Sequence, residues 1–433
     1  MGFDFPADAG GRRSSLAFGR AVVADALRTV DPAAAAAAER EPDWRKGYVR
    51  HFVKLTELAS PEVAAAGLAS VHRRFDRPDL DGGAAAAVET IVGSGTPERE
   101  VTLPYRGRLL RGSELGRQLD AWVSGSVIEQ SCADAVREVA GNPEWLDVAG
   151  HTLVVLGAGA EMGPLAAWLG WGGTVVGVDL PRPDLWERVV AVAGKSAGRL
   201  LALRADLLAE LPEVAGCLAE VPGPLVLGNY VYAPGATYPR LAVAVDALGE
   251  HLRRRRDDVT LAGLATPTDA FNVPAAAVAE SRERWQRRSL RAKAGHRLGA
   301  GRVMAPNYPD GSPAVFDGLF PIQGPNYALA KRILRWRSAL TSPVVFGVAP
   351  STRTRSVTSN RLLAAAYAGA HLFDVEIFEP ATASKLMAIL LVHQLRKPHP
   401  FDEGYAAAHG GLWRAPFRPR TALPLAAVRG LFP

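Results

Sequence analysis

The sequence predicts an α/β protein with a doubly wound parallel sheet, preceded by an all-helical N-terminal region and followed by a C-terminal helical extension. From His151 onward, short aliphatic runs alternate with amphipathic stretches of helical length, and before His151 the patterns are helical. The runs are TLVVLGAG, TVVGVDL, RLLALRADLL, PLVLGNYVY, DVTLAGLAT and PVVFGVAPS, in chain order. Continuous apolar strands of this kind are typical of a parallel sheet with helices on both faces.

The N-terminal region, residues 1–147, carries helix start and stop signals. Ser60 stands before a proline and a glutamate in SPEVAAAGLASVHRRF, which predicts an N-cap and a first helical turn. Ser113 and Ser131 are expected to cap two further helices, and Gly141 is expected to end the second of them. The pattern therefore predicts an all-helical region.

The rest of the chain divides into two segments. The sheet-forming domain is expected to cover residues 148–360, with an insertion at about residues 270–320, and the helical extension to cover residues 361–433. The helices of the extension are expected to form a substrate lid or, in a homo-oligomer, a dimer face. The stretch AHGGLWRAPFRPRT is rich in glycine and proline and is expected to lie on the surface or to cover the substrate cleft.

Composition and charge exclude several classes of protein. Apolar residues make up 48% of the 433 residues and charged residues 22%, which is a globular balance. Lysine and arginine number 50 against 44 acidic residues, which gives a net charge of +6. The sequence does not predict a basic face interleaved with aromatic residues, so a nucleic-acid partner is not expected. No apolar run has the length of a transmembrane helix, and the N-terminus does not resemble a signal peptide. With only two cysteines, we expect a soluble, cytoplasmic protein.

The first aliphatic run leads into a glycine turn that is typical of cofactor binding. Gly157, Gly159 and Gly163 form a G-x-G-x-x-x-G pattern directly after a strand, where a helix is expected to begin. Glycines let the backbone turn tightly and approach a pyrophosphate, which free N–H groups at a helix N-terminus would hold. Asp179 ends the second run, where a carboxylate accepts hydrogen bonds from ribose hydroxyls. Together these residues predict a Rossmann-like site for the adenosine half of a cofactor.

The identity of that cofactor stays open at this point. Asp179 would repel a 2′-phosphate and favours NAD, whereas Arg182 would compensate for the repulsion and admit NADP. S-adenosylmethionine is the alternative, because methyltransferases also combine a glycine turn with an acid at the end of the second strand. In a third interpretation the glycines only let the strand and the helix pack closely.

A tyrosine and a lysine in GPNYALAKRILRW indicate acid-base chemistry. Tyr327 and Lys331 are four residues apart on a predicted helix and therefore share one face. The ammonium group of Lys331 would lower the pKa of the Tyr327 phenol and hold ribose hydroxyls, which would suit the tyrosine to proton transfer. The alternative is an amphipathic helix with the aromatic side chain inside and the lysine outside.

In chain order these motifs resemble the short-chain dehydrogenase/reductase family. That family has an acid for the adenine after its third strand, an asparagine motif after its fourth, a catalytic serine or threonine after its fifth, a Tyr-x-x-x-Lys pair, and a threonine turn beside the nicotinamide. The matching residues are Asp206 in RADLL, Asn229 in LGNYVYAPG, Thr266 and Thr268 in TLAGLATPTD, Tyr327, Lys331, and Thr352 and Thr354 in VAPSTRTRS. The resemblance implies catalytic roles for the fifth-strand threonines, the tyrosine and the lysine, and cofactor-binding roles for the others.

The sequence departs from the family pattern in three ways. The glycine turn has a different spacing, and Ser351 replaces a glycine of the last turn. Thr266 and Thr268 also stand much farther before Tyr327 than is usual in the family. The insertion at about residues 270–320 would account for that separation.

The insertion contains a basic stretch, SRERWQRRSLRAKAGHR, around Trp285. A solvated helix face is the ordinary explanation, and the alternatives are a site for an anionic group of the substrate or contact with a membrane surface. The basic residues are Arg282, Arg284, Arg287, Arg288, Arg291, Lys293 and Arg297.

Three hypotheses follow for function. The first is an NAD(P)-dependent oxidoreductase that interconverts a carbonyl and an alcohol on a fairly apolar small molecule. The second is an S-adenosylmethionine-dependent methyltransferase, in which Asp179 holds the ribose and the loop from Gly228 to Tyr232 lines the methyl-transfer site. The third is a non-catalytic nucleotide-binding Rossmann protein. His393, His399 and His409 have no metal-ligand spacing, so no metal is expected.

Overall fold

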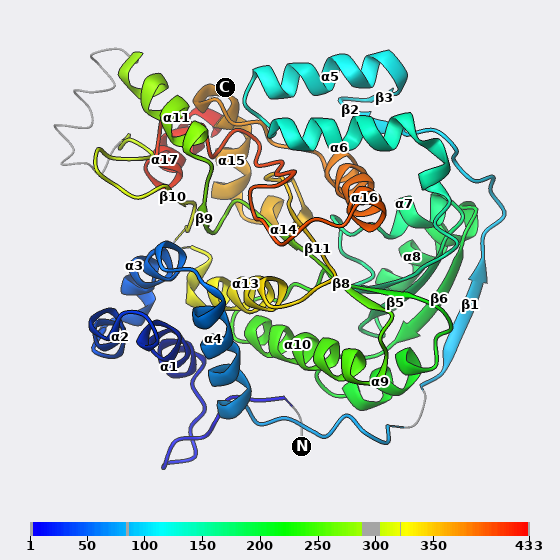
Figure 1. Ribbon diagram of the computed structural model, residues 1–433, viewed down its shortest axis with the longest axis horizontal. Coiled ribbons are helices and arrows are strands. Elements are labelled where there is room, and N and C mark those ends of the chain that lie inside the picture. The colour runs from blue at the N-terminus through cyan, green and yellow to red at the C-terminus, as the bar shows by residue number, and fades with distance from the viewer. Residues whose placement is uncertain (1–2, 84–85, 288–303, 321, 432–433) are drawn as a thin grey trace.

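A seven-stranded sheet lies at the centre of the protein in the computed structural model, which describes residues 3–83, 86–287, 304–320 and 322–431 (Figure 1). Its strands are β1 (Val88–Val92), β4 (Thr152–Leu156), β5 (Thr174–Asp179), β6 (Arg199–Arg204), β7 (Leu225–Asn229), β8 (Val259–Ala265) and β11 (Val344–Val348). Their order across the sheet is β1-β6-β5-β4-β7-β8-β11. All neighbours run parallel except β1 and β6, so the predicted fold class is confirmed.

The strand order determines where a ligand would bind. From β4 the chain moves outward through β5 and β6, then returns to the other side of β4 and continues through β7, β8 and β11. This is the order of dinucleotide-binding sheets. In such sheets ligands bind outside the carboxyl ends of the strands, where the direction of winding switches, which here is between β4 and β7.

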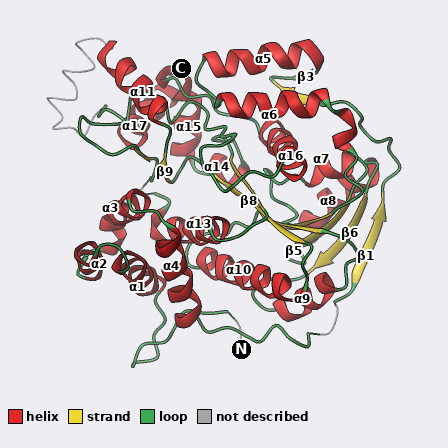
Figure 2. Cartoon of the chain, viewed as in Figure 1, coloured by secondary structure: helices red, strands yellow, loops and turns green. Residues whose placement is uncertain are grey.

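Helices cover both faces of the sheet, as Figure 2 shows. One face is covered by α9 (Leu211–Ala219), α10 (Thr237–Arg255) and α13 (Gly324–Ala339). Against α13 pack α1 (Ser15–Arg28), α3 (Trp44–Glu57) and α4 (Pro61–Arg74), and α2 (Pro32–Glu39) packs on α1 and α3. The other face is covered by α7 (Leu165–Gly170), α8 (Pro183–Lys195) and α16 (Pro380–Arg396). Helix α6 (Gln130–Gly141) and the short 3-10 helix η1 (Pro143–Leu146) pack on α16, and α5 (Gly112–Ser124) packs on α6.

The central strand β4 divides its side chains between two hydrophobic cores. Val154 and Leu156 belong to the core under α9, α10 and α13, whereas Leu153 and Val155 belong to the core under α7 and α16. Successive side chains of a strand point to opposite faces, so a strand buried on both sides must be apolar throughout. This explains the uninterrupted aliphatic run in the sequence.

The N-terminal region is not all helical, which corrects the prediction for residues 1–147. Strand β1 pairs antiparallel with β6 at the edge of the sheet, and a hairpin is formed by β2 (Leu103–Tyr105) and β3 (Arg108–Leu110). Val88 and Val92 are 43% and 67% exposed, so β1 is not buried on both faces. Its sequence, VETIV, therefore lacks the uninterrupted apolar run that marks the central strands. The hairpin turn depends on positive φ at Arg106 and Gly107.

One of the three predicted helix caps is confirmed. The Ser60 side chain accepts a hydrogen bond from the backbone of Val63 at the start of α4. Helices α5 and α6 instead begin after Arg111 and Glu129, so Ser113 and Ser131 lie inside the first turn. Ser131 Oγ accepts a hydrogen bond from the backbone of Ala406 instead.

The insertion and the C-terminal extension complete the fold. The insertion contains β9 (Ala270–Asn272), α11 (Ala275–Arg287) and β10 (Val315–Asp317), and β9 pairs antiparallel with β10. The extension contains α14 (Arg355–Thr358), α15 (Arg361–Gly369), the 3-10 helix η2 (Ala370–Phe373), α16 and α17 (Pro419–Leu431).

The structure corrects two expectations for the extension in part. Helix α16 is not a lid or a dimer face, because it is buried against β11, α6 and α7. A lid role for α15 stays a prediction. The glycine- and proline-rich stretch does not lie on the surface, since His409 and Trp413 are fully buried and Trp413 packs on Phe271 of the insertion. Its apolar side chains fill the space between the insertion and β11, which no local pattern reveals.

A buried charge cluster joins the extension to the N-terminal region. Glu129 accepts hydrogen bonds from Arg414 Nη2 at 2.6 Å and Nε at 3.0 Å, and its Oε1 lies 3.0 Å from His409 Nε2. Although burial opposes the shift, these partners lower the pKa of Glu129 to about 2. The cluster therefore stabilises the fold above the ordinary glutamate pKa of 4.5, and this stabilisation is lost as the pH falls toward 2.

The Glu129→Gln variant is expected to be less stable than the parent by about 2 kcal/mol at neutral pH, because Arg414 would lose one of its two carboxylate partners and keep only Glu280. Its free energy of unfolding should also vary less between pH 5 and pH 3, since one depressed carboxyl pKa is removed. Urea unfolding followed by circular dichroism at several pH values measures both effects. Equal stability of the two proteins at neutral pH would contradict this account.

Candidate functional site

A cavity of about 770 Å³ opens at the carboxyl ends of the central strands, and every residue predicted for the site lines it. This volume lies in the range of small-molecule sites. The residues are Gly157, Gly159 and Gly163 after β4, Asp179 and Arg182 after β5, Asp206 after β6, Asn229 at the end of β7, Thr266 and Thr268 after β8, Tyr327 and Lys331 on α13, and Thr352 and Thr354 after β11. Six parallel strands thus bring together residues from distant parts of the chain.

The glycine turn depends on glycine at two of its positions. Gly157 has φ +89°, and a Cβ there would lie 3.0 Å from the carbonyl oxygen of Tyr230. A Cβ at Gly159 would lie 2.8 Å from the Leu185 side chain. Any side chain at Gly157 would therefore meet both backbone strain and rigid backbone atoms.

Asp179 is bonded to this turn. Its Oδ2 accepts a hydrogen bond from the backbone N–H of Gly159 at 2.9 Å, and its Oδ1 accepts one from Leu180 at 2.9 Å. Burial raises the pKa of Asp179, and these two hydrogen bonds oppose the rise. Each oxygen keeps a further lone pair that a hydroxyl group can use.

The helix after the glycine turn begins later than expected. Helix α7 starts at Leu165, beyond Gly163, and has only six residues. The intervening turn carries Glu161, which accepts hydrogen bonds from Arg355 through the backbone N–H at 2.7 Å and through Nε at 3.1 Å. This ion pair attaches α14 to the glycine turn.

Three hydroxyl groups form a hydrogen-bonded cluster at the other end of the cavity, called the hydroxyl cluster below. Thr266 Oγ1 lies 2.9 Å from the Tyr327 hydroxyl and 2.9 Å from Thr268 Oγ1, and Thr268 Oγ1 lies 3.1 Å from the Tyr327 hydroxyl. The three residues come together although 61 and 59 positions separate the threonines from the tyrosine. Such a cluster can hold a phenol proton in a fixed direction.

Burial dominates the acidity of Tyr327. It raises the pKa of the phenol, while the charge of Lys331 and the hydrogen bonds of the two threonines oppose the rise. Lys331 Nζ lies 6.0 Å from the centre of the Tyr327 ring and donates to the carbonyl of Leu264 at 3.4 Å. Lys331 thus acts in the direction expected from the sequence, but the net shift is upward.

The other predicted residues are held mainly by local contacts. Asp206 Oδ1 accepts from the backbone of Leu208 at 2.8 Å. Arg182 is paired with Asp184 at 2.9 Å, and both side chains are exposed. The buried Thr352 hydroxyl donates to a carbonyl of its own turn at 2.8 Å.

Thr354 occupies the N-cap position of α14 with extended backbone angles, φ −76° and ψ 162°, but its side chain makes no capping hydrogen bond. Its hydroxyl lies 2.9 Å from the Ser356 hydroxyl. The side chains of Thr354 and of Asn229, at the end of β7, both line the cavity, and neither has a long-range hydrogen-bond partner in the described residues. Both side chains therefore stay available to a ligand.

Sequence reasoning missed Tyr238 and Gln323 of the cavity, and it named Tyr232 only for the methyltransferase hypothesis. Tyr238 and Tyr232 pack on Tyr327 with ring centres 5.7 and 6.5 Å away, and Tyr232 is 58% exposed. Gln323, one turn before Tyr327, also lines the cavity, and its Oε1 is buried without a hydrogen-bond partner in the described structure. The helical spacing of Gln323 from Tyr327 was the available signal.

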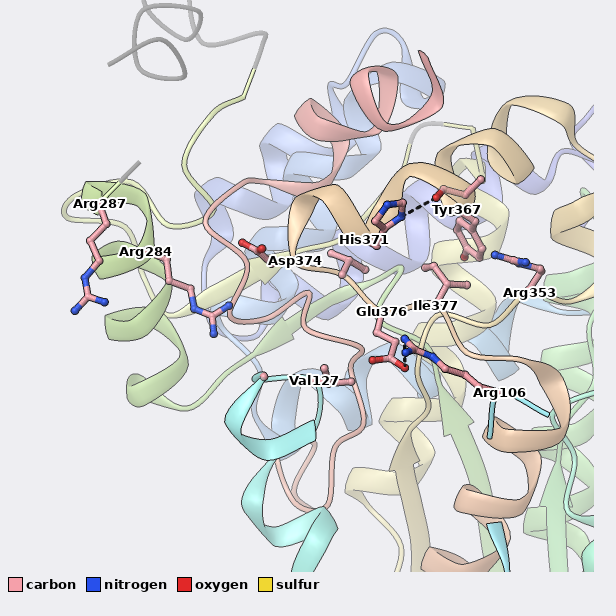
Figure 3. A pocket seen from close by; sticks show the side chains of 13 residues that line it. Arg106, Val127, Arg284, Arg287, Arg353, Tyr367, His371, Asp374, Glu376 and Ile377 are labelled. Carbon is pink, nitrogen blue, oxygen red and sulfur yellow. Dashed lines mark hydrogen bonds and ion pairs between the residues drawn. The ribbon is translucent and has the colours of Figure 1, made fainter. Parts of the chain in front are cut away.

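Figure 3 shows the residues that line a second cavity of about 720 Å³. Tyr367 lines both this cavity and the first. The second cavity contains four arginines, each of which has a glutamate within 4 Å. The pairs are Arg106 with Glu376 at 3.6 Å, Arg284 with Glu280 at 2.6 Å, Arg287 with Glu283 at 2.5 Å, and Arg353 with Glu379 at 3.6 Å.

The basic stretch of the insertion is described only in part. Arg282 donates to the carbonyl of Pro309 at 3.0 Å, and Arg284 and Arg287 form the pairs given above. The exposed Arg287 fits the ordinary interpretation, a solvated helix face, whereas Arg282 and Arg284 are half-buried among internal partners. Arg288, Arg291, Lys293 and Arg297 lie outside the described residues.

Neither a metal site nor a membrane span is found in the part of the chain that the structure describes. The described residues contain no group of at least three His, Cys, Asp or Glu side chains that could hold a metal ion. No helix there combines the length and the hydropathy needed to traverse a bilayer.

Comparison with known proteins gives a distant likeness only. No protein-family model matches the chain, and no curated protein sequence matches it. The solved structures that match include a Serratia marcescens short-chain dehydrogenase/reductase mutant with two phenylalanines changed to tyrosine, at 15% identity and a TM-score of 0.34. A second mutant, with both changed to leucine, matches at 14% identity and a TM-score of 0.33. Each match covers 61% of this chain and 98% of that chain.

Proposed function

We propose that the protein is an NAD(P)-dependent oxidoreductase that interconverts a carbonyl and an alcohol on a fairly apolar small molecule. The observation that carries this proposal is the hydroxyl cluster, which shares one cavity with the glycine turn and Asp179. A dinucleotide held at the turn by its adenosine half would extend across the switch point of the sheet toward the cluster. S-adenosylmethionine remains the alternative cofactor, but methyl transfer would leave the buried phenol of Tyr327 without a role.

The cavity residues fit a nicotinamide dinucleotide. The turn at Gly157 leaves no room for a side chain, which is the feature that lets a backbone approach a pyrophosphate. Asp179 would accept from a ribose hydroxyl, which favours NAD, because Arg182 is already paired with Asp184. Asp206 would meet the adenine, and the nicotinamide half would lie among the residues that follow β7 and β11.

The residues of the chain then have distinct tasks in the reaction. The nicotinamide, when bound, supplies or accepts the hydride. Tyr327 would donate the proton to the carbonyl oxygen, and its raised pKa keeps the phenol protonated at neutral pH. The hydroxyls of Thr266 and Thr268 would hold the phenol and polarise the carbonyl oxygen, and Lys331 would stabilise the phenolate that forms.

The cavity wall favours an apolar substrate. Tyr232 and Tyr238 pack on Tyr327, and Leu241, Ile322 and Leu363 line the same cavity. Aromatic and aliphatic walls exclude water and bind ligands through apolar contact.

Cofactor binding tests the proposal without knowledge of the substrate. Titration with NADH, NADPH and S-adenosylmethionine, followed by fluorescence and by the melting temperature, is expected to show a rise in Tm with NADH. A ligand at a hundredfold excess over its Kd stabilises a protein by ~2.7 kcal/mol, which is readily measured. A rise with S-adenosylmethionine alone would favour the methyltransferase, and no rise with any of the three would favour a non-catalytic protein.

A further inference from the structure

A buried ion pair links the two segments that carry the hydroxyl cluster. Asp269 follows Thr268 directly, and Arg335 lies on α13 two helical turns beyond Tyr327. Arg335 Nη1 donates to Asp269 Oδ2 at 2.8 Å and to the carbonyl of Ala270 at 2.7 Å. The side chains of Arg335 and Asp269 are only 3% and 1% exposed.

Further charged and polar groups complete this link. Arg335 Nε and Nη2 donate to the two carboxylate oxygens of Glu403 at 2.5 and 2.7 Å, which ties α13 to the C-terminal extension. The adjacent Arg332 lies 3.9 Å from Asp269 and donates to Thr56 on α3 at 2.7 Å. Two arginines of α13 therefore flank the Asp269 carboxylate, and each of them is also bonded to another part of the chain.

The insertion makes such a link necessary. It leaves the sheet domain at Asp269 and returns at Gly318, whose backbone N–H donates to the Asp269 carbonyl at 3.1 Å. A Cβ at Gly318 would lie only 2.1 Å from the carbonyl oxygen of Pro267. The returning chain therefore lies directly against the loop that carries Thr266 and Thr268, called the threonine loop below. The position of that loop relative to α13 is thus set by tertiary contacts across the insertion.

We propose that Asp269 and Arg335 are positioning residues that hold the threonine loop and α13 at the separation that the hydroxyl cluster requires. The positioning role itself is argued from geometry, and only the expected effect on catalysis rests on the proposed function. Hydrogen bonds between hydroxyl groups weaken over a few tenths of an ångström, and a misplacement of 1 Å can lower a rate by about a hundredfold.

Stability alone does not explain a pair of this kind. Two charges removed from water gain little net free energy of folding, and well-packed apolar residues often replace such pairs without loss. What the pair supplies is a fixed geometry, because the planar guanidinium binds both Asp269 and Glu403 through directed N–H groups.

The test compares Asp269→Asn and Arg335→Lys with a matched control in the full-length protein labelled with 13Cζ-tyrosine. The control is Arg337→Lys, which disrupts a different ion pair of α13. Arg337 Nε and Nη2 donate to the two carboxylate oxygens of Asp246, on α10, at 2.7 and 2.8 Å. The Tyr327 resonance is assigned by its loss in Tyr327→Phe. We expect both test variants to shift and broaden this resonance and to lower kcat at least tenfold, with the Kd for NADH changed less than threefold, which is the pattern of a displaced reacting group.

The control variant is expected to lower the Tm while it leaves the Tyr327 resonance and kcat unchanged. The proposal is overturned if the resonance is unaffected in both test variants, if the control alters it equally, or if both test variants fail to fold while the control folds. A shifted resonance in a protein without any oxidoreductase activity would reject the proposed function but not the positioning role.

Discussion

Replacement of Tyr327 by phenylalanine is expected to lower kcat for carbonyl reduction by about a thousandfold, because a positioned general acid contributes a factor of this order. The phenylalanine ring would keep its packing against Tyr238 and Tyr232, so the loss falls on the hydroxyl group and its bonds to Thr266 and Thr268. Turnover is measured with NADH and a panel of hydrophobic aldehydes and ketones, together with the Kd for NADH, which should change little.

Tyr238→Phe serves as the matched comparison for this variant. Tyr238 lines the same cavity and contacts the Tyr327 ring, but its hydroxyl is no part of the hydroxyl cluster. We expect it to change kcat far less than the Tyr327 variant does. Full turnover by Tyr327→Phe, or equal losses in the two variants, would remove Tyr327 from the proposed chemistry.

The second large effect is expected at the glycine turn, where Gly157→Val should weaken NADH binding by at least a hundredfold. A β-branched residue is strained at φ +89°, and its Cβ would lie 3.0 Å from the Tyr230 carbonyl, so the turn must move. Binding is measured by fluorescence titration. Part of the strain will appear as a lower Tm, which is recorded alongside.

Gly150→Ala provides the control, because a Cβ at Gly150 would meet no atom within 4 Å. It should bind NADH as the parent does. If Gly157→Val folds and still binds NADH with the parent affinity, the glycine turn is only a packing feature, as the third interpretation of the sequence holds.

The sheet was predictable because its strands are buried on both faces. Their uninterrupted aliphatic runs distinguish β4, β5 and β7 from the helices between them, and parallel pairing follows from that alternation. Strand β1 was not predictable in this way, since Val88 and Val92 are exposed at the edge of the sheet and the pairing with β6 is made by backbone groups.

The site was predictable where chemistry depends on residue type and position after a strand. Gly157 and Asp179 lie at the ends of adjacent strands, so the topology brings them together. The contact between Thr266 and Tyr327 could be suggested only by resemblance, because an insertion separates them. The buried Asp269 and Arg335 were missed, since no local pattern reveals an ion pair formed across that distance.

The central claim is that a nicotinamide dinucleotide lies in this cavity with its nicotinamide half beside Tyr327, and the 13Cζ resonance of Tyr327 tests it most directly. We expect NADH to shift this resonance, and ADP-ribose, which lacks the nicotinamide, to bind at the glycine turn and leave the resonance nearly unchanged. Binding of NADH without any change at Tyr327, or equal changes with the two ligands, would contradict the account.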